Sequence, residues 1–266
     1  MVLVIVVAVL ALLAGLAANR WLRPRLVNGD DHDGMAVKDL VGPLLTMTVL
    51  LLSFVLVTAN GSYGKAEVAS RGEARALDQL VETAEYAPKA EQARIQADAV
   101  CYARAVRAQE WPAMADGNGS AAPSVWSTSV RGSFKSLVGQ PVFGMLVSAD
   151  NKRSDEREER LTQATSSIPG TIFWVLLATL VITVAALRVC LPRKNNRGQL
   201  ITLVVITALL TTALVIIRDV DRPFGGIIDV APTAITAAGQ EAERDYTADY
   251  PASELPCDAD GNRRAT

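Results

Sequence analysis

The chain has 266 residues, half of them apolar and 5% aromatic, with a formal net charge of −2. A nucleic-acid-binding protein needs an excess of basic side chains for its phosphate contacts, so this balance argues against that class. The single histidine, His32, argues against a Ser-His or Cys-His hydrolase, and one imidazole among flexible carboxylates does not make a zinc site. No glycine-rich phosphate-binding loop is present, so we predict neither an enzyme nor a cofactor.

Four long apolar segments are the main feature of the sequence: residues 2–18, 40–59, 168–187 and 199–217. None of them contains Asp, Glu, Lys or Arg, and each approaches the ~20 residues that a helix needs to cross ~30 Å of hydrocarbon. We therefore predict an all-α, polytopic membrane protein with four transmembrane helices embedded in a lipid bilayer. Its expected parts are a first helix pair (1–59), a helical extramembrane domain (60–167), a second helix pair (168–217) and a polar tail (218–266).

The block 60–167 shows helical periodicity interrupted by glycine and proline. Gly61 and Gly64 are expected to interrupt the chain after the second span. The expected helices run from near Glu67 to Pro88, from there to Trp111-Pro112, around Trp126 to Val138, and from Val142 to Thr165. The charged second half of the last helix is expected to be a solvated face, with Glu156 and Arg160 paired four residues apart.

Charge in the short loops predicts the orientation. The connections 19–39 and 188–198 are basic, lie on one side of the membrane, and are expected to be cytoplasmic. The block 60–167 and the tail then lie on the extracytoplasmic side of the membrane. Cys101 and Cys257 share that side, whereas Cys190 lies on the other. A Cys101–Cys257 disulfide is one expectation, and a buried Cys101 with a free Cys257 in a loose tail is the other.

Several short motifs resemble those of a known family. Ser53-Phe54-Val55-Leu56 is similar to the pore-helix motif of bestrophin anion channels. The Asn-x-x-Tyr ending at Tyr63 and the acidic-x-Arg pair of Glu73 and Arg75 resemble elements that follow it in bacterial members. Pro223, Phe224 and Gly225 resemble the bestrophin Pro-Phe-Gly after the fourth span. The block from Cys101 to Pro112, which includes Trp111, is similar to the bacterial bestrophin-like domain family. The resemblance to that family would cover nearly the whole chain.

The resemblance implies a ring of identical subunits around a pore that is lined by the second span and conducts an inorganic anion. Leu50, Phe54 and Thr58 recur every four residues, so they form one stripe on that helix, and they are the pore-lining candidates. The alternative is that Leu50 and Phe54 face lipid or a neighbouring helix. In bestrophins the matching stripe is an apolar neck, from which Thr58 departs. Hydroxyls of Thr46, Thr48 and Ser53 are expected either to face the ion or to bond to their own helix.

Two further expectations follow. Asp229 is the one carboxylate in the segment just after Pro-Phe-Gly, so the calcium site of calcium-sensing bestrophins is not carried over. A charge cluster at the mouth of the fourth span is expected to pair with the region of Glu73 and Arg75; its members are Arg218, Asp219, Asp221 and Arg222.

The alternative function is a non-conducting scaffold or envelope protein whose extramembrane domain binds a partner.

Overall fold

The structure is a computed structural model that describes residue 6, residues 41–190 and residues 197–264. Within these ranges the regular secondary structure is helical, apart from one isolated antiparallel bridge between Cys257 and Arg263, and turns or irregular segments join the helices. The expected first span (2–18), apart from residue 6, and His32 lie outside the described residues. The chain divides into two compact units, which are described separately below. Unit 1 comprises Met1–Asn60 and Ser167–Asp221, and unit 2 comprises Gly61–Ser166 and Arg222–Thr266.

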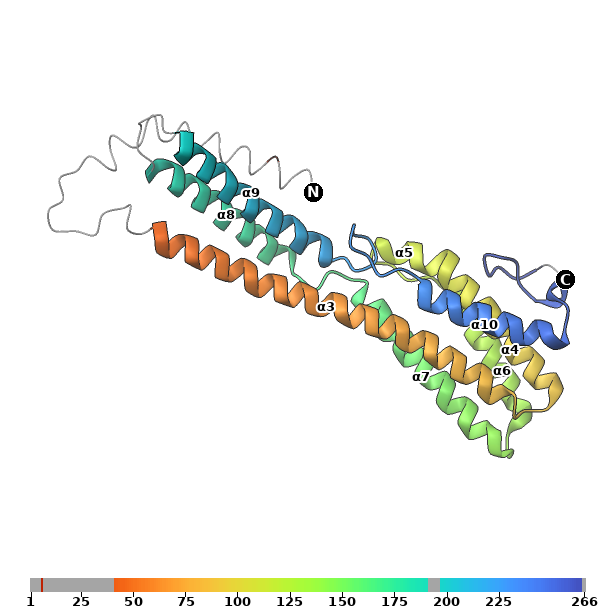
Figure 1. Cartoon of the computed structure of the whole chain (residues 1–266). Coiled ribbons are helices and arrows are strands. Elements are labelled where there is room, and N and C mark those ends of the chain that lie inside the picture. The colour runs from red at the N-terminus through yellow and green to blue at the C-terminus, as the bar shows by residue number, and fades with distance from the viewer. Residues whose placement is uncertain (1–5, 7–40, 191–196, 265–266) are drawn as a thin grey trace, which may run out of the picture. The chain divides into compact units, whose positions relative to one another are not determined.

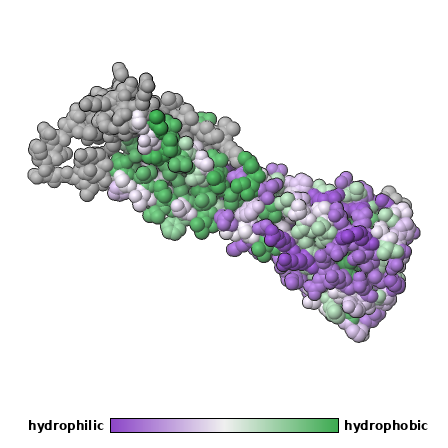
Figure 2. Space-filling view, viewed as in Figure 1, coloured by the Kyte–Doolittle hydropathy of each residue, from purple (hydrophilic) through white to green (hydrophobic). Residues whose placement is uncertain are grey.

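Unit 1 contains three helices that are long and apolar enough to cross a membrane. These are the first part of α3 (Val41–Ala84), α8 (Gly170–Cys190) and α9 (Arg197–Val220). They coincide with the second, third and fourth predicted spans. Helices α8 and α9 lie side by side (Figure 1). Apolar residues cover the face of unit 1 seen in Figure 2, as a bilayer requires.

A hydrogen bond between hydroxyls joins two of these helices. Thr48 of α3 and Thr183 of α8 are buried, and their Oγ1 atoms are 2.7 Å apart. Thr48 also lies 2.8 Å from the carbonyl oxygen of Leu44. Hydroxyl pairs of this kind satisfy polar groups where water is absent and hold apolar helices in register.

The prediction that Gly61 and Gly64 interrupt the chain was wrong, because α3 continues through them to Ala84. Glycine in a helix interior costs roughly 0.5–1 kcal/mol relative to alanine. Beyond these glycines, in unit 2, Ala66, Ala69 and Leu77 are buried. Burial of this apolar face outweighs the local cost of the glycines.

Unit 2 is built from short helices around a central one, α4. Its elements after α3 are α4 (Lys89–Ala105), a π-helical turn η2 (Val106–Glu110), α5 (Trp111–Ala115), α6 (Ala122–Ser133), a 3₁₀ turn η3 (Phe134–Leu137), α7 (Pro141–Gln163), α10 (Thr233–Asp249) and a 3₁₀ turn η4 (Ala252–Glu254). Three prolines punctuate this series: Pro88 precedes α4, Pro112 is in the first turn of α5 and Pro141 begins α7. At the starts of α4 and α7, proline forfeits no helical hydrogen bond. Pro112 instead lies in a helical stretch that continues from η2 into α5. The helix was predicted to end at Trp111-Pro112. This was wrong, because helical structure continues through α5 to Ala115.

The tail packs into unit 2 from Arg222 onward. Helix α10, which the sequence analysis did not predict, contacts α4, and α4 also contacts α6. Ten of the 17 residues of α4 are buried, so this helix has partners around most of its circumference. Close approach of α10 depends on Gly239, because a Cβ there would lie 2.6 Å from the Cβ of Ala103. Small residues on both helices bring the tail onto α4.

Candidate functional site

The predicted pore stripe lies on an uncovered face of α3. Leu50 is 53% exposed, Phe54 is 71% exposed and Thr58 is exposed. The opposite face of the helix is buried at Thr48, Leu52 and Ala59. A shallow groove runs along the uncovered face; its lining residues are Gly42, Pro43, Thr46, Met47, Leu50, Leu51 and Phe54. Unit 1 therefore leaves the stripe available, within the described residues, to a bilayer or to another subunit.

The hydroxyls beside the stripe bond to their own helix, the second of the two expected arrangements. Thr46, Ser53 and Thr58 each donate to the carbonyl oxygen four residues earlier, at 3.1, 2.8 and 3.0 Å. Their protons are thus already used, as is common for threonine and serine in apolar helices. The stripe presents hydrocarbon from Leu50 and Phe54, and the Thr58 hydroxyl adds no outward-directed proton.

The six residues of the predicted charge cluster are divided between the two units. In unit 1, the Arg218 guanidinium lies 4.8 Å above the centre of the Phe173 ring. Asp221 accepts hydrogen bonds from the amides of Ser167 and Ile168, both at 3.0 Å, and so fixes the segment that leads into α8. In unit 2, Arg75 and Arg222 are exposed. Glu73 instead belongs to a buried network.

The network is centred on Arg160 of α7, which is fully buried. Its Nε lies 2.5 Å from Oε2 of Glu73, and its Nη2 lies 2.6 Å from Oε2 of Glu110. A second arginine, Arg157, donates to the other oxygen of Glu110 at 2.5 Å. The Tyr102 hydroxyl donates to Glu73 at 2.6 Å. Helices α3, α4 and α7 and the turn η2 thus contribute charged or hydrogen-bonding groups to one interior site.

Two predictions about α7 were wrong. Arg160 pairs with Glu73 and Glu110, and not with Glu156 on its own helix. The charged half of α7 is not a fully solvated face either, because Arg153 and Arg160 are buried. The spacing of Arg153, Arg157 and Arg160 places all three on one side of a helix, a signal that would have indicated an inward-facing basic surface.

Glu110 and Arg160 stay charged in this network in spite of burial. Burial raises the pKa of Glu110, but hydrogen bonds and charge from Arg157 and Arg160 outweigh it and hold that pKa below its ordinary value. Burial lowers the pKa of Arg160, and the charges of Glu73 and Glu110 more than reverse the effect. Burial and the Glu73 charge both raise the pKa of Tyr102, so its hydroxyl stays protonated and serves as a donor. The arrangement binds helices together and supplies neither a nucleophile nor a general base.

The π-helical turn η2 places Glu110 inside this network. Glu110 is the last residue of the turn and is fully buried. A π-turn adds a residue to the helical repeat, so it rotates the following side chains relative to an uninterrupted α-helix. Periodicity in the sequence does not reveal such a turn, and Glu110 was accordingly missed as a site residue.

The family-motif residues from Tyr63 onward lie in unit 2, whereas Ser53-Phe54-Val55-Leu56 belongs to unit 1. The Trp111 and Phe224 rings meet edge to face with centroids 5.4 Å apart, and Trp111 Nε1 donates to the Val230 carbonyl at 2.9 Å. Arg160 lies 5.0 Å above the Trp111 ring.

Pro223 is buried in the same segment as Phe224, where its carbonyl accepts the Val230 amide. Close packing also requires Gly225, whose Cβ would lie 2.6 Å from the carbonyl oxygen of Ala115. From α3, Tyr63 donates to the Asp229 carbonyl at 3.4 Å.

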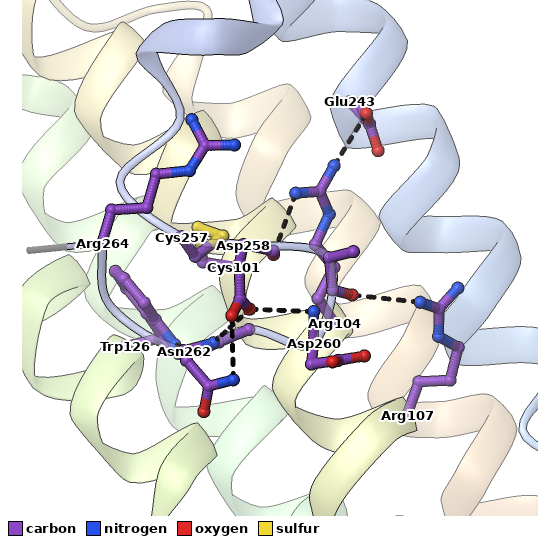
Figure 3. The surroundings of a disulfide bond; sticks show 12 residues. Cys101, Arg104, Arg107, Trp126, Glu243, Cys257, Asp258, Asp260, Asn262 and Arg264 are labelled. Atoms are coloured by element: carbon purple, nitrogen blue, oxygen red, sulfur yellow. Dashed lines mark hydrogen bonds and ion pairs between the residues drawn. A yellow bond between two sulfur atoms is a disulfide. The ribbon is translucent and has the colours of Figure 1, made fainter.

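The predicted Cys101–Cys257 disulfide is present, with both cysteines fully buried and their Cα atoms 5.7 Å apart. It anchors a C-terminal loop, residues 257–263, against α4 and α6 (Figure 3). Four consecutive carbonyls of the loop, from Asp258 to Gly261, accept side-chain hydrogen bonds. Their donors are Arg104 (3.1 Å), Arg107 (3.2 Å), Gln109 (2.8 Å) and Trp126 (2.8 Å). The loop is therefore a fixed part of unit 2.

Two features of the loop explain its shape. The Asp258 carboxylate accepts the amides of Asp260 and Asn262, both at 2.9 Å, which closes a tight turn. Gly261 has φ of 76°, and a Cβ there would lie 2.4 Å from the amide nitrogen of Ala105.

Among the residues that the structure describes, no three His, Cys, Asp or Glu side chains are grouped to hold a metal ion.

Comparison with known proteins agrees with this fold. The model of the bestrophin-like domain matches residues 6–235. A variant of a bacterial bestrophin homologue from Klebsiella pneumoniae superposes with a TM-score of 0.69 at 14% identity, over 92% of this chain and 99% of that one. A Klebsiella pneumoniae bestrophin homologue solved by zinc phasing gives 0.62 at 14% identity, over 94% and 99%. A variant described only as a membrane protein gives 0.72 at 14% identity, over 93% and 99%. No curated protein matches the sequence. The match over most of its length shows that the chain belongs to the bestrophin-like domain family.

Proposed function

We propose that this protein is a homo-oligomeric anion channel of the bacterial plasma membrane, with four spans per subunit and a pore lined by α3. The observation that carries the proposal is the uncovered stripe of α3, where Leu50 and Phe54 are exposed although they lie in a long apolar helix. Sister subunits arranged around an axis would bring these side chains together as a ring. The bestrophin-like family and the superposition on bestrophin homologues support this arrangement.

The stripe's chemistry fits a gate that works by excluding water. A narrow ring of leucine and phenylalanine offers an ion no replacement for its hydration shell, so a slight constriction empties the neck of water and stops conduction. The hydroxyls of Thr46, Ser53 and Thr58 do not relieve this, because their protons are bonded to α3 itself. Residues 40–59 carry no carboxylate that would repel an anion.

Replacing Leu50 or Phe54 with alanine is expected to raise chloride flux several-fold in liposomes that contain the full chain. Each substitution removes apolar bulk from the neck, which widens it and lowers the cost of wetting. Leu209→Ala in α9 is the matched control, since Leu209 is also exposed (66%) but does not lie on α3. Its flux is expected to equal that of the wild type.

The opposite result would favour the non-conducting scaffold. Absence of flux in all four proteins, together with a monomeric mass in detergent, would contradict the channel. Equal increases in Leu50→Ala and Leu209→Ala would show that any lost apolar side chain perturbs the membrane, and would remove α3 from the pore.

We further propose that unit 2 lies on the extracytoplasmic side. The Cys101–Cys257 disulfide supports this, because disulfides persist in oxidising compartments. Basic residues in the short loops 19–39 and 188–198 point the same way.

A phosphatase that folds only outside the cytoplasm is expected to be active when fused after Thr266. The same fusion placed within residues 191–196 is expected to be inactive and serves as its matched control. An inactive terminal phosphatase, with an active cytoplasmic reporter at the same position, would place unit 2 in the cytoplasm and refute the orientation.

A further inference from the structure

Unit 2 contains a cleft that is separate from the charge network and from the pore stripe. It has a volume of about 580 Å³ and lies among α4, α6, α10 and the segment just before Cys257. Small-molecule sites commonly enclose about 300–1,000 Å³ and combine an apolar lining with a few polar groups. The cleft fits this description, since the alanines of α4 supply apolar surface and one buried carboxylate lies among them.

The buried carboxylate is Asp98 of α4, which is only 5% exposed. Its neighbours are the Ser129 hydroxyl of α6, which hydrogen-bonds to it, and the charges of Arg94 on its own helix and Arg263 on the C-terminal loop. Burial outweighs these three and raises the pKa of Asp98 to about 6. A carboxylate kept from water in this way gains much from a partner that is cationic and donates hydrogen bonds.

The cleft also has an aromatic lining. Tyr246 of α10 and Tyr250, which follows the last residue of α10, stack with ring centroids 5.3 Å apart and an interplanar angle of 24°. Tyr246 is buried and Tyr250 is half-buried, so part of the pair remains open to the cleft. The face of a tyrosine ring attracts an organic cation electrostatically and packs against the carbon atoms attached to it.

The lining residues themselves carry a net negative charge, since their charged members are Asp98, Glu254 and Arg94. Arg263 of the C-terminal loop, which is not a lining residue, adds a second guanidinium near Asp98. Lys89, the other nearby cation on α4, pairs with Asp249 at 3.0 Å. Glu254 lies three residues before Cys257, and the disulfide therefore fixes this edge of the cleft.

We propose that the cleft is a binding site for a small organic ammonium compound with an apolar or aromatic body. The ammonium group binds the Asp98 carboxylate, and the body lies against Tyr246 and Tyr250. Glu254 attracts the cation at the entrance. This site is independent of the proposed conduction, because every lining residue belongs to unit 2 and none lies on the stripe of α3.

Binding of 2-phenylethylammonium to the full chain in nanodiscs, measured by calorimetry, tests the proposal. Saturable binding is expected, whereas the neutral 2-phenylethanol and the anionic phenylacetate are expected not to bind. Asp98→Asn is expected to lower the affinity for 2-phenylethylammonium by at least about tenfold, since it removes the charge-assisted hydrogen bond. Tyr250→Ala, which leaves the carboxylate in place, is expected to lower this affinity several-fold. Glu241→Gln is the control, because Glu241 is exposed on α10 outside the cleft lining.

The pH dependence provides a second readout. Only ionised Asp98 binds the ammonium, and a pKa of about 6 leaves roughly a tenth of it ionised at pH 5. Affinity is therefore expected to rise about tenfold from pH 5 to pH 7.5 in the wild type and to stay level in Asp98→Asn. No saturable binding by the wild type, equal binding of 2-phenylethanol, or an unaltered affinity in Asp98→Asn would each overturn the proposal.

Discussion

Replacing Arg160 with alanine is expected to lower the free energy of unfolding of unit 2 by about 3–5 kcal/mol, because it leaves two buried carboxylates without their shared cation. Glu73 and Glu110 are each no more than 1% exposed, and Arg160 bonds to both. Arg157 still reaches Glu110, so Glu73 would lose most. Denaturant unfolding followed by the fluorescence of Trp111 and Trp126, in a Trp21→Phe, Trp174→Phe background, measures the change.

Arg71→Ala is the matched control for this substitution. Arg71 also pairs with a glutamate, Glu67, but their side chains are 61% and 41% exposed. An exposed pair of this kind is worth about 0–1 kcal/mol, so the control is expected to unfold almost as the wild type does. Adding Glu73→Gln to Arg160→Ala is expected to recover part of the loss, since it removes one unpaired charge. Equal stabilities for Arg160→Ala and Arg71→Ala would contradict the role given to the network.

Reduction of the Cys101–Cys257 disulfide is expected to cost unit 2 about 2–5 kcal/mol of stability. The bridge spans a sequence separation of 156 residues, so it removes much of the conformational freedom of the unfolded chain. The C-terminal loop is expected to become susceptible to protease at the same time, since Cys257 is its anchor. Unfolding midpoints with and without dithiothreitol, combined with limited proteolysis, measure both effects.

Two cysteine variants separate the bridge from a general effect of reductant. Cys257→Ala is expected to be as unstable as the reduced wild type and to lose nothing more when dithiothreitol is added. Cys190→Ala keeps the bridge and is expected to respond to dithiothreitol as the wild type does. A wild type that is indifferent to reductant, or separate alkylated peptides for Cys101 and Cys257 without reduction, would refute a stabilising bridge.

The membrane-spanning helices could be predicted because their signal is local. Long runs without charge identify a span wherever they occur, and three of the four predicted spans correspond to α3, α8 and α9. The remaining one, the first predicted span (2–18), lies outside the described residues apart from residue 6. Pro88 and Pro141 likewise mark helix starts through their own geometry. The Cys101–Cys257 bridge was one of two expectations, because the predicted topology puts Cys101 and Cys257 on one side and Cys190 on the other; the structure contains the bridge.

What the sequence analysis missed depends on contacts between distant residues. Whether the charged half of α7 is solvated is decided by Glu73 and Glu110, which lie 87 and 50 residues from Arg160 in the chain. The continuity of α3 through Gly61 and Gly64 is decided by tertiary burial, against local propensity. Helix α10 depends on Gly239 fitting against Ala103. Local patterns carry no information on any of these partners.

The C-terminal loop has a consequence for how relatives of this protein diverge. Its contacts with Arg107 and Gln109 are made by the carbonyls of Ala259 and Asp260, which every amino acid possesses. The side chains at these two positions are therefore free to change while the contacts persist. Gly261 is not, because any side chain there would collide with Ala105. Relatives that keep the disulfide should be recognised by the glycine four residues after its second cysteine, even where the intervening sequence has drifted.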